Sequence, residues 1–439
     1  MTAVEERRFN RAQWRFLLCS IAAYAFFYIT RKNLSMAQPA MLEEGVISTY
    51  TLGTIMTVHG VLYGISRFVN GFWADRLNGR IFMATGLVLS AMMTLLFGCS
   101  SATVFFAAFW ILNGWTQGMG FPPCAKMLAH WIHPKELATK MSIWNSSHSI
   151  GAFLALGICT VLFAFGFGWR WCFYIPAALA AMGAAFTFFF VKDSPTEAGV
   201  HELEIETAGR TSSPAVRSAC GDTRPRVTTA DRRRLVFGNK VIWVVAMANF
   251  FVYVVRFGFL DWGPTFLKQH KGIPVEKGGL MIIAFELAAV AGTIFAGWIT
   301  DKAFKGRGAR TCVICMFLAA LFAAGFWFLP DGASGVWATS LLMGTGFFIY
   351  GPQGLTGIIA ANQATKDAAA MANGFTGIMG YASTIVSGLG LAFIKERFGW
   401  DAALAAIACF ALVGMALFML AWNAAPDGYS RKAADTSEQ

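Results

Sequence analysis

The fold is decided by the stretch GFWADRLNGR at residues 71–80, which lies between two long apolar runs. A second copy of its pattern, GWITDK at residues 297–302, stands in the second half of the chain and is followed by further basic residues. Both copies read G-x-x-x-D-[RK] and then a basic cluster. A pattern that recurs between apolar runs indicates an internal repeat. We therefore expect two structurally equivalent halves.

Two arginines inside apolar runs repeat in the same way. Arg31 follows Tyr28 by three positions, and Arg256 follows Tyr253 by three positions. In transporters built from repeats, the substrate site lies near the middle of the membrane, between the repeats. We therefore expect Arg31 and Arg256 to face each other across the interface of the two halves.

The composition is that of a membrane protein. Hydrophobic residues make up 56% of the 439 residues and charged residues 13%, whereas soluble domains carry about 25% charged residues. A spanning helix needs about 20 apolar residues. Apolar runs of this kind begin near residues 14, 50, 81, 102, 139, 169, 241, 278, 311, 336, 368 and 400. The sequence predicts an all-α membrane protein with twelve transmembrane helices in two pseudo-symmetric six-helix halves.

Between the sixth and seventh runs lies a polar segment rich in Ser, Thr, Pro, Gly and Arg. It predicts three parts: an N-terminal half at 1–191, a cytoplasmic linker at 192–240, and a C-terminal half with a short tail at 241–439. Most of the 35 Lys and Arg residues fall on one side if both termini are cytoplasmic. The positive-inside rule therefore favours a multi-pass protein of the bacterial inner membrane with both termini in the cytoplasm.

The net charge of +11 would suggest nucleic acid in a soluble protein. Here the basic residues lie in the short breaks between apolar runs, where membrane topology requires them, so no nucleic-acid partner is expected. In the repeated loops, an acidic residue and its basic neighbour can pair with helix ends and hold one side of the protein shut. The gating residues are Asp75, Arg76, Asp301 and Lys302. The alternative is that the loops are plain basic turns that set topology.

Charged residues within the predicted spans each need a reason. A charge at the bilayer centre costs at least about 2.5 kcal/mol. Arg31 and Lys32 follow an apolar run of about 22 Å, shorter than the core of roughly 30 Å, so ending the helix there would leave it too short. Arg67 lies close enough to Gly71 that its side chain could instead extend to the surface. The remaining charges in the spans are Arg256, Asp261 and Glu286.

Four basic and two acidic residues leave two positive charges in the helical region. Guanidinium groups bind phosphate oxygens through paired, charge-assisted hydrogen bonds. An Arg31–Arg256 pair therefore favours a phosphate-bearing ligand over a neutral sugar or a cation. His148 lies in the predicted fifth helix and can donate to a phosphate oxygen; a structural role is the alternative.

Several segments resemble the organophosphate:phosphate antiporter family of the major facilitator superfamily. They are Tyr24-x-x-x-Tyr28-x-x-Arg31-Lys32-Asn33, Gln117-Gly-Met-Gly-Phe121, Trp144-Asn145-x-x-His148, Tyr253-x-x-Arg256-x-Gly258-x-x-Asp261-Trp262 and Tyr350-Gly-Pro352. The resemblance covers nearly the whole chain except the linker, and within the family it is strongest to bacterial glycerol-3-phosphate transporters.

The resemblance implies uptake of an organic phosphate, with glycerol 3-phosphate as the first choice, in exchange for internal inorganic phosphate by alternating access. It implies that Arg31 and Arg256 hold the phosphate with help from His148. It also implies a pocket lined by Tyr24, Tyr28, Arg67, Gln117, Asn145, Tyr253, Tyr350 and Tyr381. Lys32, Asp261 and Glu286 would form ion pairs that change between states.

The organic part of the substrate stays open. Arg67 stands where glycerol-phosphate transporters usually have Lys, and Phe121 where they usually have Trp. The alternatives are a hexose-phosphate or phosphoglycerate transporter, or a sensor of sugar phosphate. A proton-coupled carrier of an unphosphorylated substrate is a further alternative. It would need a buried acidic residue without a basic partner, for which Glu286 is the candidate. We expect no enzymatic activity, cofactor or metal, and a protein that functions as a monomer in the lipid bilayer.

Overall fold

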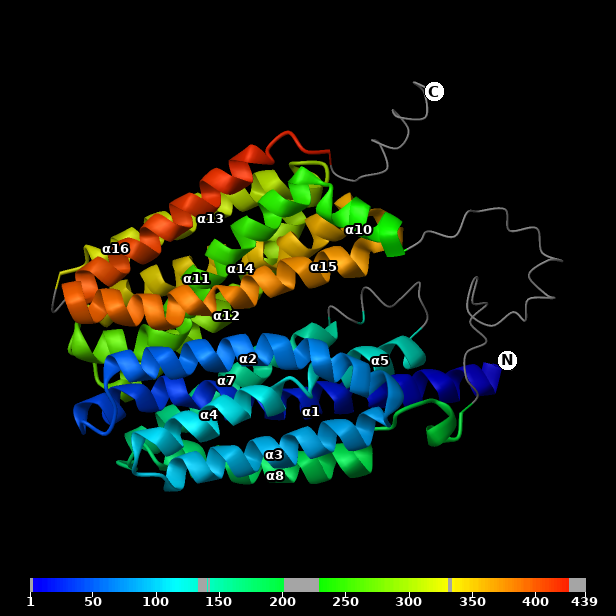
Figure 1. The fold of residues 1–439 in the computed structure, drawn as a ribbon, viewed down its shortest axis with the longest axis horizontal. Helices are drawn as coiled ribbons and strands as arrows, with labels where there is room; N and C mark the ends of the chain where they lie inside the picture. The colour runs from blue at the N-terminus through cyan, green and yellow to red at the C-terminus, as the bar shows by residue number, and fades with distance from the viewer. Residues whose placement is uncertain (1–2, 133–139, 141–142, 201–228, 331–333, 426–439) are drawn as a thin grey trace.

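The computed structural model describes residues 3–132, 140, 143–200, 229–330 and 334–425. Within these ranges every regular element is helical. The first and second parts of the chain form two layers of long helices that run roughly alongside each other (Figure 1). This arrangement follows from the apolar runs, because a spanning segment must satisfy its backbone hydrogen bonds internally.

The N-terminal layer begins with one long helix that carries the first charged residues of the membrane interior. Its fourth span is broken where Gly118 and Gly120 separate two helices, and Phe121-Pro-Pro starts the second of them. Its elements are α1 (Ala3–Glu43), α2 (Thr49–Arg76), α3 (Gly79–Cys99), α4 (Thr103–Gln117), α5 (Phe121–Trp131), α7 (Ser147–Ala164) and α8 (Trp171–Phe190).

The C-terminal layer repeats this plan. Its last two spans meet at Gly399, whose φ of 83° is a conformation that glycine adopts at little cost. Its elements are α11 (Lys240–Gln269), α12 (Val275–Lys302), α13 (Gly308–Trp327), α14 (Gly335–Gln363), α15 (Thr365–Ala382), the π-helix η2 (Ile385–Gly390) and α16 (Leu391–Leu420).

The predicted linker contains two short helices in its described part: the 3₁₀ helix η1 (Thr196–Ala198) and α10 (Thr229–Phe237). The second of these was not predicted from the sequence. It forms because Val236, which is fully buried, packs with Ala360, Ala364 and Ala368. Residues 201–228 lie outside the described part of the chain.

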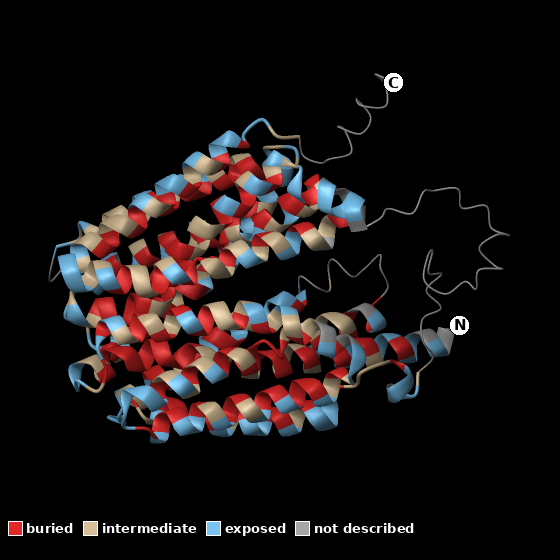
Figure 2. Ribbon diagram, viewed as in Figure 1, coloured by how far each residue is buried: buried red, intermediate tan, exposed pale blue. Residues whose placement is uncertain are grey.

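Twelve spans result when α4 and α5 are counted as one, α16 is divided at Gly399, and α15, η2 and the first part of α16 are counted as one. The prediction of twelve helices in two halves is therefore confirmed. Eight described helical stretches are long and apolar enough to cross a membrane, and the last of these, Met371–Leu420, includes two spans. Buried residues lie along the inner faces of the helices and exposed ones along the outer faces (Figure 2). Large apolar side chains such as Phe189, Val104 and Ile294 are exposed there, as lipid contact requires.

Helix ends differ from the predicted ones mainly at the N-terminus. We expected the first helix to begin near Trp14, but α1 begins at Ala3. The extra turns are rich in charged residues, which form helix readily but leave no apolar pattern. The first helix therefore extends beyond its apolar run at both ends.

The two halves are joined at one end, which we call the sealed end, where α1 ends and α2 begins. The Nζ of Lys268 lies 3.6 Å from the carboxylate of Glu43 in the other half. The Thr57 hydroxyl donates to the Thr384 carbonyl at 3.0 Å, and Lys395 donates to Thr49 at 2.8 Å.

At the opposite, terminal end, where α1 starts and α2 ends, the two layers diverge (Figure 1). Among the described residues, the hydrogen bond between halves nearest to this end joins Arg67 to Tyr381. The structure is therefore closed at the sealed end.

Candidate functional site

Arg31 and Arg256 lie within the long helices α1 and α11, one from each half. Arg31 stacks on the ring of Tyr63, with its Cζ 3.9 Å from the ring centroid. The ring of Tyr28 lies 5.3 Å from the same atom. Faces of aromatic rings attract cations, so these rings hold the guanidinium without neutralising it.

Arg256 is 94% buried, and its Cζ lies 4.6 Å from the ring centroid of Tyr350. Its Nε is sealed from solvent without a hydrogen-bond partner. The Tyr350 hydroxyl donates to Glu286 at 2.5 Å. The Glu286 carboxylate is therefore hydrogen-bonded to the tyrosine whose ring faces Arg256, and it does not form a direct ion pair with Arg256.

The two arginines share neighbours across the interface. The ring of Phe257 lies 5.5 Å from the Cζ of Arg256 and 5.3 Å from the Nζ of Lys32, the residue next to Arg31 in the N-terminal half. The rings of Tyr28 and His148 are 5.8 Å apart, and Nδ1 of His148 bonds to the carbonyl of Asn145. The structure thus brings the two repeat-related arginines to one place.

Arg67 is the third arginine of this region. Its Cζ lies 3.6 Å from the ring centroid of Phe121, and its Nη1 donates to the Tyr381 hydroxyl at 3.4 Å. The side chain is half-buried. It therefore remains between the helices and does not extend to the surface.

The other predicted pocket residues fall in three settings. Tyr24 is buried, 4.8 Å from Trp144 between ring centroids, and Tyr253 lies 6.0 Å from Tyr381. Asn145 is exposed. Gln117 is 3% exposed and donates to the hydroxyls of Thr30 and Ser90.

Gln117 takes part in a hydrogen-bond network, and its predicted contact with a ligand stays a prediction. Its amide belongs to a hydrogen-bond network inside the N-terminal half that also includes Asn113. The network joins α1, α3 and α4. Its member in α1, Thr30, directly precedes Arg31. Gln117 therefore supports the helix that carries Arg31.

The expected ion pairs are partly arranged as the resemblance implied. Lys32 and Asp261 form a buried bond of 2.6 Å between the halves. Glu286 does not join them in this structure, since its bonded oxygen accepts from Tyr350 and its other oxygen is buried without a partner.

The gating residues lie at the terminal end. Arg76, Asp301 and Lys302 are exposed, and no ion pair involves them in the described part of the chain. The side chain of Asp75 lies outside the described residues. The described ion pair near this loop joins Arg80 to Glu197 at 2.8 Å.

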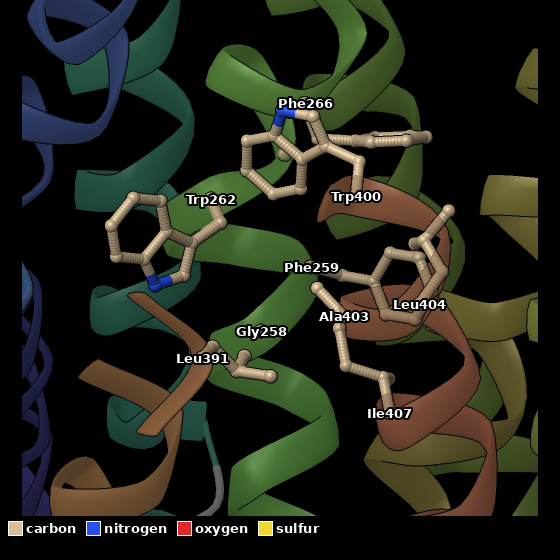
Figure 3. Close-up of a pocket in the computed structure, with 10 residues that line it drawn as sticks. Gly258, Phe259, Trp262, Phe266, Leu391, Trp400, Ala403, Leu404 and Ile407 are labelled. Atoms are coloured by element: carbon tan, nitrogen blue, oxygen red, sulfur yellow. The ribbon is translucent and has the colours of Figure 1, made fainter. Parts of the chain in front are cut away.

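A cavity of about 60 Å³ lies between the halves on the sealed side of the arginines. Its lining includes Arg31, Lys32, His59, Asp261, Tyr381 and Thr384. A second cavity of about 10 Å³ lies in the C-terminal half, between aromatic side chains of α11 such as Trp262 and the Trp400 and aliphatic side chains of α16 (Figure 3). A water molecule needs about 10–15 Å³, so this apolar gap is a packing defect and not a ligand site.

Sequence reasoning missed three contributors: Tyr63, His59 and the Lys268–Glu43 pair. Tyr63 could have been found, because it precedes Arg67 by four residues and so lies on the same helix face. His59 is 7% exposed and bonds to the Trp110 carbonyl at 2.8 Å. No repeat or motif marked it. Within the described residues, no group of three His, Cys, Asp or Glu could hold a metal ion.

Comparison with known proteins agrees with this geometry. Residues 20–388 match the model of the Major Facilitator Superfamily. The chain is 35% identical over 94% of its length to the glycerol-3-phosphate transporter of Bacillus subtilis, covering 93% of that protein. It is 33% identical to a probable hexose phosphate transport protein of Chlamydia pneumoniae, over 98% of this chain and 95% of that protein. It is 31% identical to the membrane sensor protein UhpC of Escherichia coli, over 94% of this chain and 93% of that protein.

Solved structures show the same fold. A bacterial homologue of the human lysosomal transporter Spinster, in an inward-facing and unoccupied conformation, superposes with a TM-score of 0.78 at 14% identity, over 94% of this chain and 97% of that one. The nucleoside transporter NupG gives a TM-score of 0.67 at 12% identity, over 94% of this chain and 100% of that one. These relatives are not enzymes, and neither is this protein. The chain belongs to the Major Facilitator Superfamily and, within it, to the organophosphate:phosphate antiporter family.

Proposed function

We propose that this protein takes up an external organic phosphate, glycerol 3-phosphate first among the candidates, in exchange for internal inorganic phosphate. Transport occurs by alternating access between the two halves. The supporting observation is the Arg31–Arg256 pair, in which one guanidinium from each half lies against the same group of rings. Tyr63 lies beside Arg31, Tyr253 lies beside Arg256, and Tyr381 lies between these two rings. Within the described residues, neither arginine lies within 4.0 Å of a carboxylate.

The charge of the region favours this ligand. Lys32 and Asp261 neutralise each other through a direct bond. Glu286 offsets part of the charge of Arg256 through Tyr350. Arg31 and Arg67 remain without an acidic partner, so the site carries about two positive charges. A phosphate dianion balances this charge, and it accepts paired hydrogen bonds from guanidinium groups.

The remaining roles follow from position. His148 assists the arginines, and Tyr24, Tyr28, Tyr253, Tyr350 and Tyr381 surround the ligand. Arg76, Asp301 and Lys302, with Asp75, close the terminal end when the halves rock, and the Lys32–Asp261 pair breaks when the sealed end opens. The terminal end is cytoplasmic in this proposal, in a bacterial inner membrane. The two halves, residues 1–191 and 241–439, move as bodies around the segment 192–240, and a single chain suffices.

The test is exchange in proteoliposomes that contain the purified protein and internal phosphate. External glycerol 3-phosphate, glucose 6-phosphate and 3-phosphoglycerate are supplied in turn. We expect uptake of an organic phosphate that requires internal phosphate. Uptake that proceeds equally without internal phosphate would remove the exchange mechanism.

A sensor of external sugar phosphate is the second candidate, because a relative at 31% identity is a membrane sensor protein. A sensor would bind organic phosphate with similar affinity but exchange it slowly. Equilibrium binding together with exchange rates in the same preparation distinguishes the two.

A further inference from the structure

The short helix α10 carries a cluster of positive charge at the terminal end of the C-terminal half (Figure 1). Three consecutive arginines of this helix, Arg232, Arg233 and Arg234, are all exposed. Lys240, the first residue of α11, adds a fourth positive charge, whereas Asp231 is the one acidic residue of the segment 229–240. The segment therefore has a clear excess of positive charge.

The three arginines of α10 differ from other arginines near this end in having no partner. Arg80 forms an ion pair, and Arg310 donates to the carbonyl of Trp422 and stacks on its ring. In the described part of the chain, the three side chains of α10 take part in no hydrogen bond, ion pair or ring contact. Their hydrogen-bonding edges are therefore open to a ligand.

The helix that carries these arginines is fixed to the membrane-embedded helices. Val236 is fully buried against α14 and α15. Nε1 of Trp243 in α11 donates to the carbonyl of Phe237 at 2.9 Å. Nδ2 of Asn239 donates to the carbonyl of Gln363 at the end of α14. The arginines thus have a defined place beside the surface of the C-terminal half.

Next to the arginines lie three aromatic rings, Phe237, Trp243 and Phe375, which we call the aromatic cluster. Between ring centroids, Phe375 lies 5.3 Å from Phe237 and 4.8 Å from Trp243. Phe237 and Trp243 remain 46% and 40% exposed, and Met247, one turn after Trp243, is exposed as well. Exposed apolar side chains one turn apart mark a face of α11 that contacts lipid. Aromatic side chains gather where the hydrocarbon core meets the headgroups.

The spacing along α10 places charge and ring side by side. Arg233 and Arg234 precede Phe237 by four and three positions, so the three side chains share one side of the helix. Guanidinium groups bind phosphate oxygens through paired, charge-assisted hydrogen bonds, and the exposed rings match an acyl chain. An acidic protein segment would use the arginines but would leave the aromatic cluster without a partner. The combination therefore favours a phospholipid.

We propose that α10 and the aromatic cluster form a binding site for an anionic phospholipid in the leaflet at the terminal end. The headgroup phosphate contacts the arginines, and an acyl chain lies against Phe237 and Trp243. A headgroup with a net negative charge balances the excess of positive charge, whereas a choline group next to the phosphate is repelled by it. The inference goes beyond the proposed function and does not depend on it, because it requires only that the chain lies in a membrane.

The experiment is a titration of the purified full chain in detergent with phosphatidylglycerol or with phosphatidylcholine of the same acyl chains. Native mass spectrometry gives the Kd of the first bound lipid. We expect phosphatidylglycerol to bind about tenfold more tightly, the effect of one hydrogen-bonded charge. Replacing all three arginines of α10 with Gln should reduce this preference to nearly none.

A second replacement tests the aromatic part of the site. Phe237→Ser should weaken both lipids by the same factor, because it removes a contact with the acyl chain, which the two lipids share. The water-soluble headgroup glycerophosphoglycerol should not displace phosphatidylglycerol at equal concentration, because it lacks that chain.

The matched control removes three exposed arginines from the start of α1 at the same end, in Arg7→Gln with Arg8→Gln and Arg11→Gln. It changes the net charge by the same amount, but Glu5 and Glu6 accompany these arginines in the sequence. This variant should keep the preference for phosphatidylglycerol. If the triple α10 variant does not fold, Arg233→Gln with Arg234→Gln provides the test, and an unchanged preference in it counts against the site.

Three results overturn the inference. The first is a wild-type protein that binds the two lipids equally. The second is an equal loss of preference in the α10 variant and in the α1 control, which would mean a general attraction between the positive terminal end and any anionic lipid. The third is displacement of phosphatidylglycerol by its soluble headgroup, which would mean that the arginines bind a free anion.

Discussion

At the residue scale, the site holds positive charge with aromatic rings and not with acids. Arg31 lies on Tyr63, Arg67 on Phe121 and Arg256 on Tyr350, each with its Cζ within 4.6 Å of a ring centroid. A ring orients a guanidinium and offsets part of its desolvation, yet it leaves the hydrogen-bonding edge free. This arrangement keeps the arginines available to an anion.

Replacing Arg256 with Lys tests the paired geometry. Arg256→Lys keeps the charge but offers one ammonium group in place of two parallel N–H donors, so we expect phosphate exchange to fall at least a hundredfold, about 3 kcal/mol. The measurement is phosphate exchange at equal amounts of reconstituted protein.

Arg310→Lys is the control, because Arg310 stacks on Trp422 at the terminal end, far from the site, and should tolerate the change. Exchange by Arg256→Lys at a rate near that of the wild type would contradict the assignment of the phosphate site.

Removing the Tyr350 hydroxyl tests its link to Glu286. Tyr350→Phe leaves both oxygens of a buried carboxylate without a partner, since Oε2 already lacks one. An unpaired buried polar group costs about 1–3 kcal/mol, so the melting temperature in detergent should fall by several degrees.

Tyr174→Phe is the comparison, because the Tyr174 hydroxyl donates to the neutral carbonyl of Gly98 in a half-buried setting. Equal melting temperatures for the two variants would show that the hydrogen bond from Tyr350 to Glu286 does not stabilise the protein.

At the element scale, the sealed end is built from small residues. The π-helix η2 packs on the start of α2, where an added Cβ on Gly388 would lie 2.4 Å from the Thr57 hydroxyl and 2.9 Å from the Gly53 carbonyl. An added Cβ on Gly279 of α12 would lie 2.2 Å from the hydroxyl of Thr160 in the other half. Such distances leave no room for a side chain while the seal is closed.

A bulkier residue in η2 should therefore shift the protein toward the state in which the sealed end is open. In Gly388→Val we expect a longer mean distance between nitroxide labels on Glu43→Cys and Gln269→Cys, measured by pulsed electron resonance in a cysteine-free background. Gly374→Val is the control, since nothing lies within 4 Å of a Cβ at that position in α15. A label distance that stays at the wild-type value in Gly388→Val would show that the seal does not depend on this contact.

The sequence predicted more of the elements than of their contacts. Apolar length and the repeated loop are local signals, and they gave twelve spans and two halves. The pairing of Lys32 with Asp261 was implied by family resemblance, but the approach of Gly53 to Gly388 depends on how the halves meet, which no local pattern encodes. The hydrogen bonds from Gln117 to Thr30 and Ser90 were likewise not predicted, because they depend on how three helices pack against one another.

At the scale of the whole molecule, the polar contacts between the halves are concentrated toward the sealed end. Hydrogen bonds and ion pairs between the halves extend from Lys268–Glu43 to Arg67–Tyr381 and are not found nearer to the terminal end among the described residues. Transport requires that the bonds at the sealed end break while others form at the terminal end.

Fixing the sealed end should therefore stop exchange. We expect Glu43→Cys with Lys268→Cys, joined by a short bis-maleimide, to lose phosphate exchange, because the two positions lie in different halves at the sealed end. Arg80→Cys with Glu197→Cys is the matched pair, since this ion pair joins the start of α3 to η1 in the adjacent linker and does not connect the two halves. Exchange that continues when the first pair is fully cross-linked would exclude rocking of the halves.

The unbalanced arginines also determine how the carrier responds to voltage. An empty site that changed sides would carry about two positive charges through the field, at about 2.3 kcal/mol per charge for each 100 mV. When a doubly charged anion fills it, the moving unit is close to neutral and the field does almost no work on it. Turnover between two such anions should thus be nearly the same in polarised and depolarised vesicles, and a carrier with nothing bound should stay where it is.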